Sequence, residues 1–273
     1  LKGAVRAKYL MGLAGGFLHG KNLDYEFVDD ETLSLFDSDI SYGLAENLND
    51  DFYEDYEFDV SGNTTFGFDL GFVYEWRKGA EEKYKYDMDG KTDLWRRDQN
   101  KYILKAGFSV LDMGRVFFDK PTATGNFNAD IRNWDLGGFD IEGINSFNDT
   151  LNDRFVRIAD NNEFKIKLPT AISYQLDWNI WKYFYLNHTA YISAHGKGSK
   201  GTLRSLSTYS LSPRFEHRWV GVGLPYSYQP QMDRHRIGLM LRLGPLVIDT
   251  DNLNNLKSDE PIFGADLYVA LKI

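Results

Sequence analysis

Residues 65–77 read Thr-Phe-Gly-Phe-Asp-Leu-Gly-Phe-Val-Tyr-Glu-Trp-Arg, and the alternation in this stretch decides the fold class. Successive side chains of a β-strand point to opposite faces, so every second residue shares a face. The other face carries both signs of charge beside glycine, with Val73 as its one apolar residue. The stretch therefore predicts a strand that shows an apolar face to one environment and a polar face to another. The apolar face consists of Phe66, Phe68, Leu70, Phe72, Tyr74 and Trp76.

The same alternation recurs along the whole chain. A tilted strand needs about ten alternating residues to cross a bilayer, and the recurring segments have about this length. We therefore expect an all-β fold, and specifically a transmembrane antiparallel β-barrel of the outer-membrane type. The pattern predicts nine long strands, at 1–11, 23–36, 65–77, 101–112, 170–180, 183–194, 206–228, 233–243 and 264–273.

The composition fits this class and argues against others. The chain has 273 residues, a net charge of −9, no cysteine and 15% aromatic residues, and its mean hydropathy is −0.44. A barrel shows apolar side chains to lipid only at every second position, so a negative mean hydropathy is compatible with membrane strands. No run of about 18 apolar residues occurs, so no transmembrane helix is predicted. The acidic balance argues against nucleic acid as a partner, because phosphate contacts need clustered Lys and Arg.

The alternation also predicts which way each side chain points. Inside a barrel, charged side chains must pair or be hydrated, because burying an isolated charge is costly. Either a salt-bridged plug of side chains or the wall of a water-filled pore satisfies this requirement, and the sequence leaves both open. The residues predicted to face lipid are Phe66, Phe68, Leu70, Phe72, Trp76, Leu176, Trp178, Leu239, Leu241 and Val269. The charged residues predicted to face the lumen are Arg6, Lys8, Asp69, Glu75, Lys105, Asp177, Arg234, Arg236, Arg242, Asp266 and Lys272.

The connections predict an orientation. Outer-membrane barrels have short periplasmic turns and longer extracellular loops. We therefore place the tight turns at 179–182 and 229–232 in the periplasm, which puts Trp76, Trp178 and Tyr226 in the periplasmic aromatic girdle. The charged segment 78–100 is predicted to be a hairpin protruding into the periplasm. The longer connections, expected outside the cell, are 37–64, 113–169, 195–205 and 244–263.

The connection at 113–169 is too long for a plain loop, because structureless loops beyond about 12–15 residues are uncommon in compact domains. Residues 148–160 alternate apolar and charged side chains at near-helical spacing. We expect a short helix there, lying over or inside the barrel mouth. A solvated cap without a ligand and a functional plug are both compatible with this pattern.

The sequence shows no constellation for catalysis. The five histidines, at 19, 188, 195, 217 and 235, have no zinc-site spacing, and neither G-x-S-x-G nor a glycine-rich phosphate loop occurs. His188 and Asn187 are predicted to face opposite sides of one strand, which argues against a membrane-embedded hydrolase. The acidic runs at 47–51 and 249–252 match no twelve-residue calcium loop. We therefore expect no enzyme activity, no catalytic residue, no cofactor and no bound metal.

Five segments carry a resemblance to a known family: 4–12, 66–71, 106–114, 237–246 and 263–268. They resemble the Bacteroidota outer-membrane β-barrels of unknown function that often precede an OmpA-like peptidoglycan-binding domain. Barrels of the fatty-acid-transporter type and type 9 secretion accessory barrels are the wider relatives. The resemblance implies a location in the bacterial outer membrane. It implies contact with outer-membrane lipid and lipopolysaccharide, with other envelope proteins, and with peptidoglycan through a further C-terminal domain.

Three functions remain open at this point. The leading one is a structural or accessory subunit of a Bacteroidota envelope assembly, such as protein-secretion or barrel-insertion machinery. The alternative is a porin or a transporter of small molecules or lipids. An outside alternative is a soluble β-sandwich that binds glycans through exposed aromatic side chains.

The predicted strand count bears on the extent of the barrel. Nine strands would make the first and last strands parallel, and would place Leu1 at the extracellular rim. Outer-membrane barrels normally have an even number of strands, so an odd number would be missing upstream. The family resemblance implies that about five strands are missing, so we expect residues 1–273 to be the C-terminal portion of a longer barrel of about 14 strands.

Overall fold

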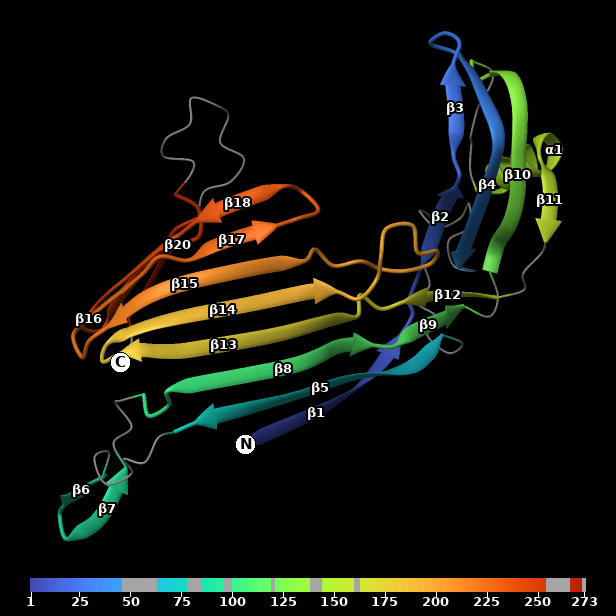
Figure 1. Ribbon diagram of the computed structural model, residues 1–273. Coiled ribbons are helices and arrows are strands. Elements are labelled where there is room, and N and C mark those ends of the chain that lie inside the picture. Colours follow the sequence, from blue (N-terminus) through green and yellow to red (C-terminus); the bar gives the residue numbers. More distant parts are fainter. Residues whose placement is uncertain are drawn as a thin grey trace.

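The computed structural model describes residues 1–45, 63–77, 85–95, 100–118, 121–137, 144–159, 163–253 and 266–271 (Figure 1). These ranges form four antiparallel sheets and one α-helix. The all-β prediction is therefore confirmed.

The main sheet is an antiparallel meander of twelve strands. Two pairs of these strands lie end to end, so the sheet is ten strand positions wide. β16 and β17 lie along one line, because β15 pairs with both of them, and β18 and β19 form the next line. Its strands are β1 (Lys2–Met11), β5 (Thr64–Trp76), β8 (Leu104–Met113), β13 (Ala171–Trp181), β14 (Phe184–Ser193), β15 (Thr208–Glu216), β16 (Val220–Gly223), β17 (Tyr226–Gln229), β18 (Arg234–Ile237), β19 (Leu239–Leu243), β20 (Leu246–Thr250) and β21 (Tyr268–Leu271).

The main sheet is strongly curved, and β16 and β20 curl behind β13–β15 in Figure 1. β1 and β21 are its two edges, and no pairing joins them within the described residues. The structure therefore shows a curved antiparallel sheet of the kind a barrel needs, without showing closure.

The predicted count of nine strands is wrong. The stretch 206–228 contains a turn at 217–219, so it forms two positions of the sheet. The predicted loop 244–263 contains β20, which follows β19 through a tight turn where Gly244 has a φ of 56°. Segment 23–36 lies outside this sheet altogether.

Ten antiparallel positions change the predicted orientation. β1 and β21 run in opposite directions, so β1 begins at the same end of the sheet at which β21 ends. Leu1 therefore does not lie at the rim opposite the last residues, and the odd strand count that predicted missing strands no longer applies. The tight turns at 182–183 and 230–233 lie at opposite ends of the sheet, so placing both on one side is also wrong. We call the end with residues 182–183, 217–219 and 244–245 the turn end, and the other the loop end.

A second sheet rises beyond the loop end (Figure 1). Its strands are β2 (Gly16–Lys21), β3 (Asp24–Phe27), β4 (Thr32–Ala45), β10 (Pro121–Asp135) and β11 (Val156–Ala159). β4 lies centrally, pairing with β10 on one side and with β2 and β3 on the other. The predicted strand 23–36 is therefore a hairpin of β3 and the start of β4. β10 forms within the predicted loop 113–169.

The expected helix exists as α1 (Ile144–Arg154), somewhat earlier than the predicted 148–160. It packs on the second sheet rather than in a barrel mouth. Leu151 and Phe155 join Leu35, Tyr42 and Phe127 in one buried apolar cluster. The second sheet thus has a core of its own under a helical cover.

Two short ribbons complete the fold. β9 (Arg115–Phe118) and β12 (Phe164–Lys167) extend β8 and β13 and pack under the second sheet, where Phe118 and Phe164 stack at 4.8 Å. β6 (Lys85–Met88) and β7 (Lys91–Trp95) form a hairpin at the turn end, as predicted for segment 78–100 (Figure 1).

Candidate functional site

The main sheet has an inverted distribution of polar and apolar side chains. Along β5 the large apolar residues are exposed at alternate positions, and the residues between them are covered. Phe72 is 51% exposed, whereas Asp69 is 8% exposed. A sheet face that water contacts normally carries the polar residues, so this distribution is the reverse of that in a water-soluble sheet.

Most residues predicted to face lipid lie on this exposed apolar face. Leu239 and Leu241 are half-buried. Val5, Ile172 and Leu211 extend the same face onto β1, β13 and β15. The predicted residues that are exposed are Phe66, Phe68, Leu70, Phe72, Trp76, Leu176, Trp178 and Val269.

Aromatic side chains gather at the turn end of this face. Trp76 and Trp178 lie there as predicted, and both are exposed. Trp181 stacks on Phe184 with ring centroids 6.0 Å apart. Tyr226 does not belong to this group, because it begins β17 opposite Leu211, away from the turn end.

The covered face of the main sheet holds two charged clusters. In the first, Lys8 donates hydrogen bonds to Asp69 Oδ1 at 2.8 Å and to Asp112 Oδ1. The backbone N–H of Asp112 also donates to Asp69 Oδ1 at 2.8 Å. Asp112 can reach Asp69 because β8 bulges there, where Asp112 has a φ of 54°.

The second cluster lies nearer the turn end. Arg214 donates from Nη2 to Asp177 Oδ2 at 2.7 Å and from Nε to Glu216 Oε1 at 2.7 Å. The Tyr102 hydroxyl donates to the same Asp177 oxygen at 2.6 Å, and the Arg214 guanidinium lies over the Tyr185 ring. Asp177 is 5% exposed. A cation and a hydroxyl therefore compensate the charge at Asp177 Oδ2, whereas Oδ1 is buried without a hydrogen-bond partner among the described residues.

The other predicted lumen charges are more dispersed. Glu75 accepts from Arg77 at 2.6 Å, and Lys105 lies over the Tyr102 ring at 6.0 Å. Arg242 donates to the backbone oxygens of residues 217 and 218, and Asp266 accepts from the backbone of residue 251. Arg6 lies 3.8 Å from Asp69 but is largely exposed. Arg236 is half-buried and Arg234 exposed. Lys272 lies outside the described residues.

The prediction missed Asp112, Tyr102 and Arg214. Period-two counting puts Asp112 on the apolar face with Phe108 and Val110, and the bulge turns it toward Asp69 on the covered face instead. Alternation with Leu104 and Val110 would put Tyr102 on the apolar face, but Tyr102 precedes β8 and turns toward Asp177. Arg214 was hidden inside the misread stretch 206–228. The motif Leu111-Asp112-Met113-Gly114, already used for the family resemblance, was the one available signal for Asp112.

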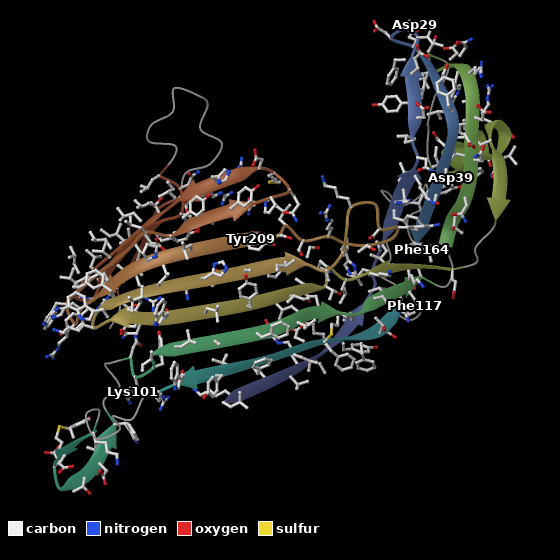
Figure 2. All side chains as sticks on the ribbon, in the orientation of Figure 1. Asp29, Asp39, Lys101, Phe117, Phe164 and Tyr209 are labelled. Carbon is white, nitrogen blue, oxygen red and sulfur yellow. The ribbon has the colours of Figure 1, made fainter. Side chains whose placement is uncertain are left out.

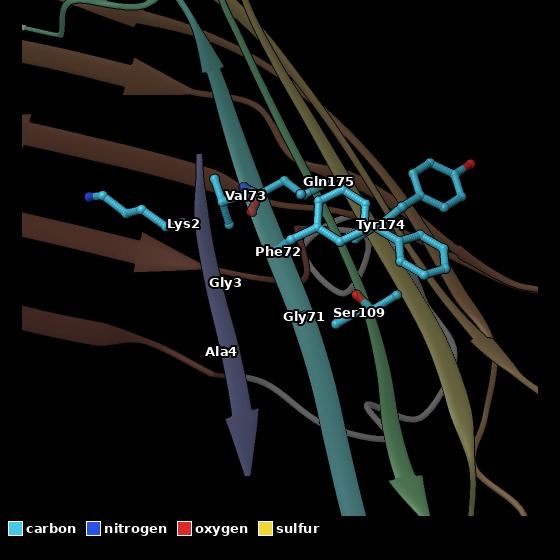
Figure 3. Close-up of a pocket in the computed structure, with 12 residues that line it drawn as sticks. Lys2, Gly3, Ala4, Gly71, Phe72, Val73, Ser109, Tyr174 and Gln175 are labelled. Carbon is cyan, nitrogen blue, oxygen red and sulfur yellow. The ribbon is translucent and has the colours of Figure 1, made fainter.

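Between the clusters the sheet is lined by small residues. Gly71 and Ser109 oppose each other on β5 and β8, and a side chain added at Gly71 would meet Ser109 Cβ at 3.2 Å. An open hollow of about 300 Å³ lies here against β1, β5, β8 and β13. In Figure 3, Lys2 and Val73 project to one side of the sheet and Phe72 and Tyr174 to the other. Lys2 is the only charged residue that lines this hollow among the described residues.

The structure brings no described histidine into a catalytic arrangement. His188 bonds with the Tyr174 hydroxyl at 3.0 Å and with the Ser210 carbonyl at 2.9 Å, on the apolar face. Within the described ranges, no three His, Asp or Glu residues are placed to hold a metal ion. In the same part of the chain, no helix is long and apolar enough to span a membrane.

The chain belongs to a family of unknown function, DUF5723, whose model matches residues 1–251. No curated protein matches the chain. No solved structure matches it either.

Proposed function

We propose that the main sheet spans a bilayer as the wall of an outer-membrane-type β-barrel, with its exposed apolar face toward lipid. The observation that carries this proposal is the inversion along β5, where alternate apolar residues are exposed while Asp69 is covered. In water such a face would leave a large apolar surface uncovered, which soluble monomers rarely do. In lipid the same face needs no further partner.

The dimensions of the sheet agree with a bilayer. The apolar residues of β5 run from Phe66 to Trp76. At about 3.3 Å per residue this is about 33 Å along the strand, and a tilt of about 40° reduces it to about 25 Å. The lipid-facing band of outer-membrane barrels is about 25 Å tall. The aromatic group at the turn end then lies at one membrane interface, where Trp and Tyr are enriched.

We further propose that the protein is a structural or accessory subunit of an envelope assembly. The second sheet supports this role, because it lies beyond the apolar band and has its own covered core. The ribbon of β9 and β12 ties it to the main sheet through buried aromatic contacts. A folded unit attached in this way to a membrane wall is suited to present a docking surface outside the bilayer.

A porin or transporter is the second candidate. The observation that favours it is the hollow lined by small residues on the covered face. The paired charges of the two clusters favour the structural role instead, because they fill the interior with side chains held to one another. Planar-bilayer conductance distinguishes the two functions: a barrel whose lumen is filled by side chains conducts nothing, whereas a barrel with an open lumen conducts ions.

The test compares two substitutions of exposed aromatic residues. Phe72 on β5 is 51% exposed and Tyr25 on β3 is 54% exposed. An Arg at a lipid-facing midplane position costs about 2–4 kcal/mol in barrels. Phe72→Arg should therefore block insertion into phosphatidylcholine vesicles, measured by flotation and resistance to carbonate extraction, and Tyr25→Arg should not.

Equal insertion of both variants would refute the membrane wall. A wild-type chain that stays monodisperse without detergent would also refute it, and would favour the soluble glycan-binding alternative.

A further inference from the structure

The ribbon of β9 and β12 has two unlike faces. Phe118 and Phe164 belong to the buried cluster that joins the two sheets, and the partly buried Ile166 packs against it. The opposite face carries Arg115, Phe117, Lys165 and Lys167, because Arg115 pairs with Lys167 and Phe117 with Lys165. Figure 2 labels Phe117 and Phe164 at this ribbon, below the second sheet. We call Arg115, Lys165 and Lys167 the ribbon cations.

The ribbon cations lie on the side of the exposed apolar face. A side chain added at Gly67, on the covered side of β5, would meet Leu168 at 3.3 Å. Leu168 therefore points to the covered side, and by alternation Lys167 points to the other. The apolar face and the ribbon cations thus form one continuous surface.

The ribbon cations also begin where the apolar band ends. Phe68 pairs with Met113, and a side chain at Gly114 would lie 3.2 Å from the Phe66 carbonyl oxygen. Arg115 therefore follows at the level of Phe66, the first aromatic residue of the band on β5. In the proposed membrane wall this level is that of the lipid headgroups.

The charge of these residues has no partner in the described part of the chain. None of the three ribbon cations forms an ion pair there. Arg115 and Lys165 are exposed, and Arg115 lies over the Phe117 ring at 4.9 Å. Glu163 is exposed just before the strand, so the face keeps a net positive charge in a chain of net charge −9.

We infer that the ribbon cations bind the phosphate group of an anionic lipid headgroup at the rim of the membrane wall. Arg offers a planar fork that matches phosphate oxygens, and Lys adds a point charge. Phe117 lies opposite Lys165, and its ring packs against the Arg115 guanidinium. This inference rests on the proposed membrane insertion, because only insertion brings lipid headgroups to this level.

The test uses the full chain in mild detergent, titrated with dimyristoylphosphatidylglycerol, dimyristoylphosphatidylcholine or inorganic phosphate. Native mass spectrometry counts the bound molecules. Each cation near an anionic surface changes binding by about fivefold, so Arg115→Gln, Lys165→Gln and Lys167→Gln together should weaken phosphatidylglycerol binding by up to about a hundredfold. The charge-preserving pair Lys165→Arg and Lys167→Arg should keep it.

A matched control removes the same charge elsewhere. Lys21→Gln, Lys91→Gln and Arg132→Gln change three exposed cations of β2, β7 and β10, and should leave the lipid preference unchanged. Equal loss in this control, or no preference of the wild type for phosphatidylglycerol, would overturn the inference. Displacement of the lipid by millimolar inorganic phosphate would identify a free-anion site and overturn the lipid assignment.

Failure of this inference is separable from failure of the membrane wall. A wild-type chain that enters vesicles but shows no headgroup preference refutes the inference alone. A wild-type chain that does not enter vesicles refutes both.

Discussion

The two large sheets of this chain cover opposite kinds of face. In the main sheet, Phe72 is exposed while Asp69 and Asp177 are covered. In the second sheet, Leu35 and Phe127 are buried. Alternation in the main sheet therefore specifies strands but does not specify which of their faces is covered. What differs is the material that lies against the apolar face.

The second sheet supplies that material from the chain itself. α1 follows β10, and Phe155, just after the helix, packs edge-on against Trp134 of β10 at 5.3 Å. No described helix packs on the apolar face of the main sheet, as Figure 1 shows. The second sheet is thus covered within the chain, whereas the apolar face of the main sheet, in the proposed membrane wall, would be covered by lipid.

The largest expected effect comes from a core substitution in the second sheet. Phe127 is 1% exposed and stacks on Tyr42. Phe127→Ala should destabilise the second sheet by about 3–5 kcal/mol, through lost burial and the cavity left behind. Hydrogen exchange of β4 and β10 amides measures this loss.

The matched control is Phe72→Ala on the exposed face of the main sheet, which should leave those amides protected. Phe127→Ala should in turn leave flotation with vesicles intact. Loss of membrane association in Phe127→Ala would show that the two sheets fold as one unit, and would remove the contrast between them.

The sequence specified the strands of the main sheet well because their alternation is long and strict. β5, β8, β13 and β14 fall within a few residues of the prediction. It failed where the period breaks: at the turn 217–219, at the short β20, and at the bulge of Asp112. A turn between two alternating stretches cannot be recognised from the alternation when both stretches have the same composition.

The second sheet was largely missed for a different reason. β4 carries Ser, Asp and Gly among its apolar residues and contains a residue of positive φ, Asp37 at 42°, so its alternation changes phase. β10 pairs with β4 across a long sequence separation, and register shifts interrupt the ladder. Such pairing depends on tertiary contacts that no local pattern reports. The two charged clusters were half predicted. Lys8, Asp69 and Asp177 lie in stretches of strict alternation. Their partners lie at a bulge (Asp112), before the start of β8 (Tyr102) and within the stretch 206–228 that was predicted as one strand (Arg214).

The next prediction concerns the charge pairing that stabilises the covered face of the main sheet. Arg214→Met removes the cation that faces Asp177 and leaves a buried carboxylate with the Tyr102 hydroxyl alone. Breaking such a pair costs about 3–5 kcal/mol. The urea midpoint of the folded, detergent-solubilised protein should fall, as measured by tryptophan fluorescence.

The double variant Asp177→Asn with Arg214→Met should recover a large part of that loss, because no uncompensated charge remains. A double variant as unstable as Arg214→Met alone would show that packing of the arginine, rather than charge pairing, holds this face. The covered face of the main sheet would then resemble the apolar core of the second sheet.

The smallest expected effect concerns pH at the tip of the second sheet. Asp29 lies in the turn between β3 and β4, and its Oδ1 accepts the backbone N–H of Glu31 at 3.0 Å. Hydrogen bonds from Thr32, and then from the Glu31 backbone, lower the pKa of the Asp29 carboxyl below its usual 3.8. A carboxyl with a lowered pKa in the folded state stabilises that state above the unfolded pKa, and the contribution disappears as pH falls through the folded pKa.

Protection of β3 amides should therefore decrease below about pH 3.8 in the wild type. It should be lower and less dependent on pH in Asp29→Asn. The turn-end hairpin of β6 and β7 is the internal control, because its amides do not depend on Asp29. If protection of β3 falls equally with pH in both proteins, the turn is stabilised by groups other than this carboxyl.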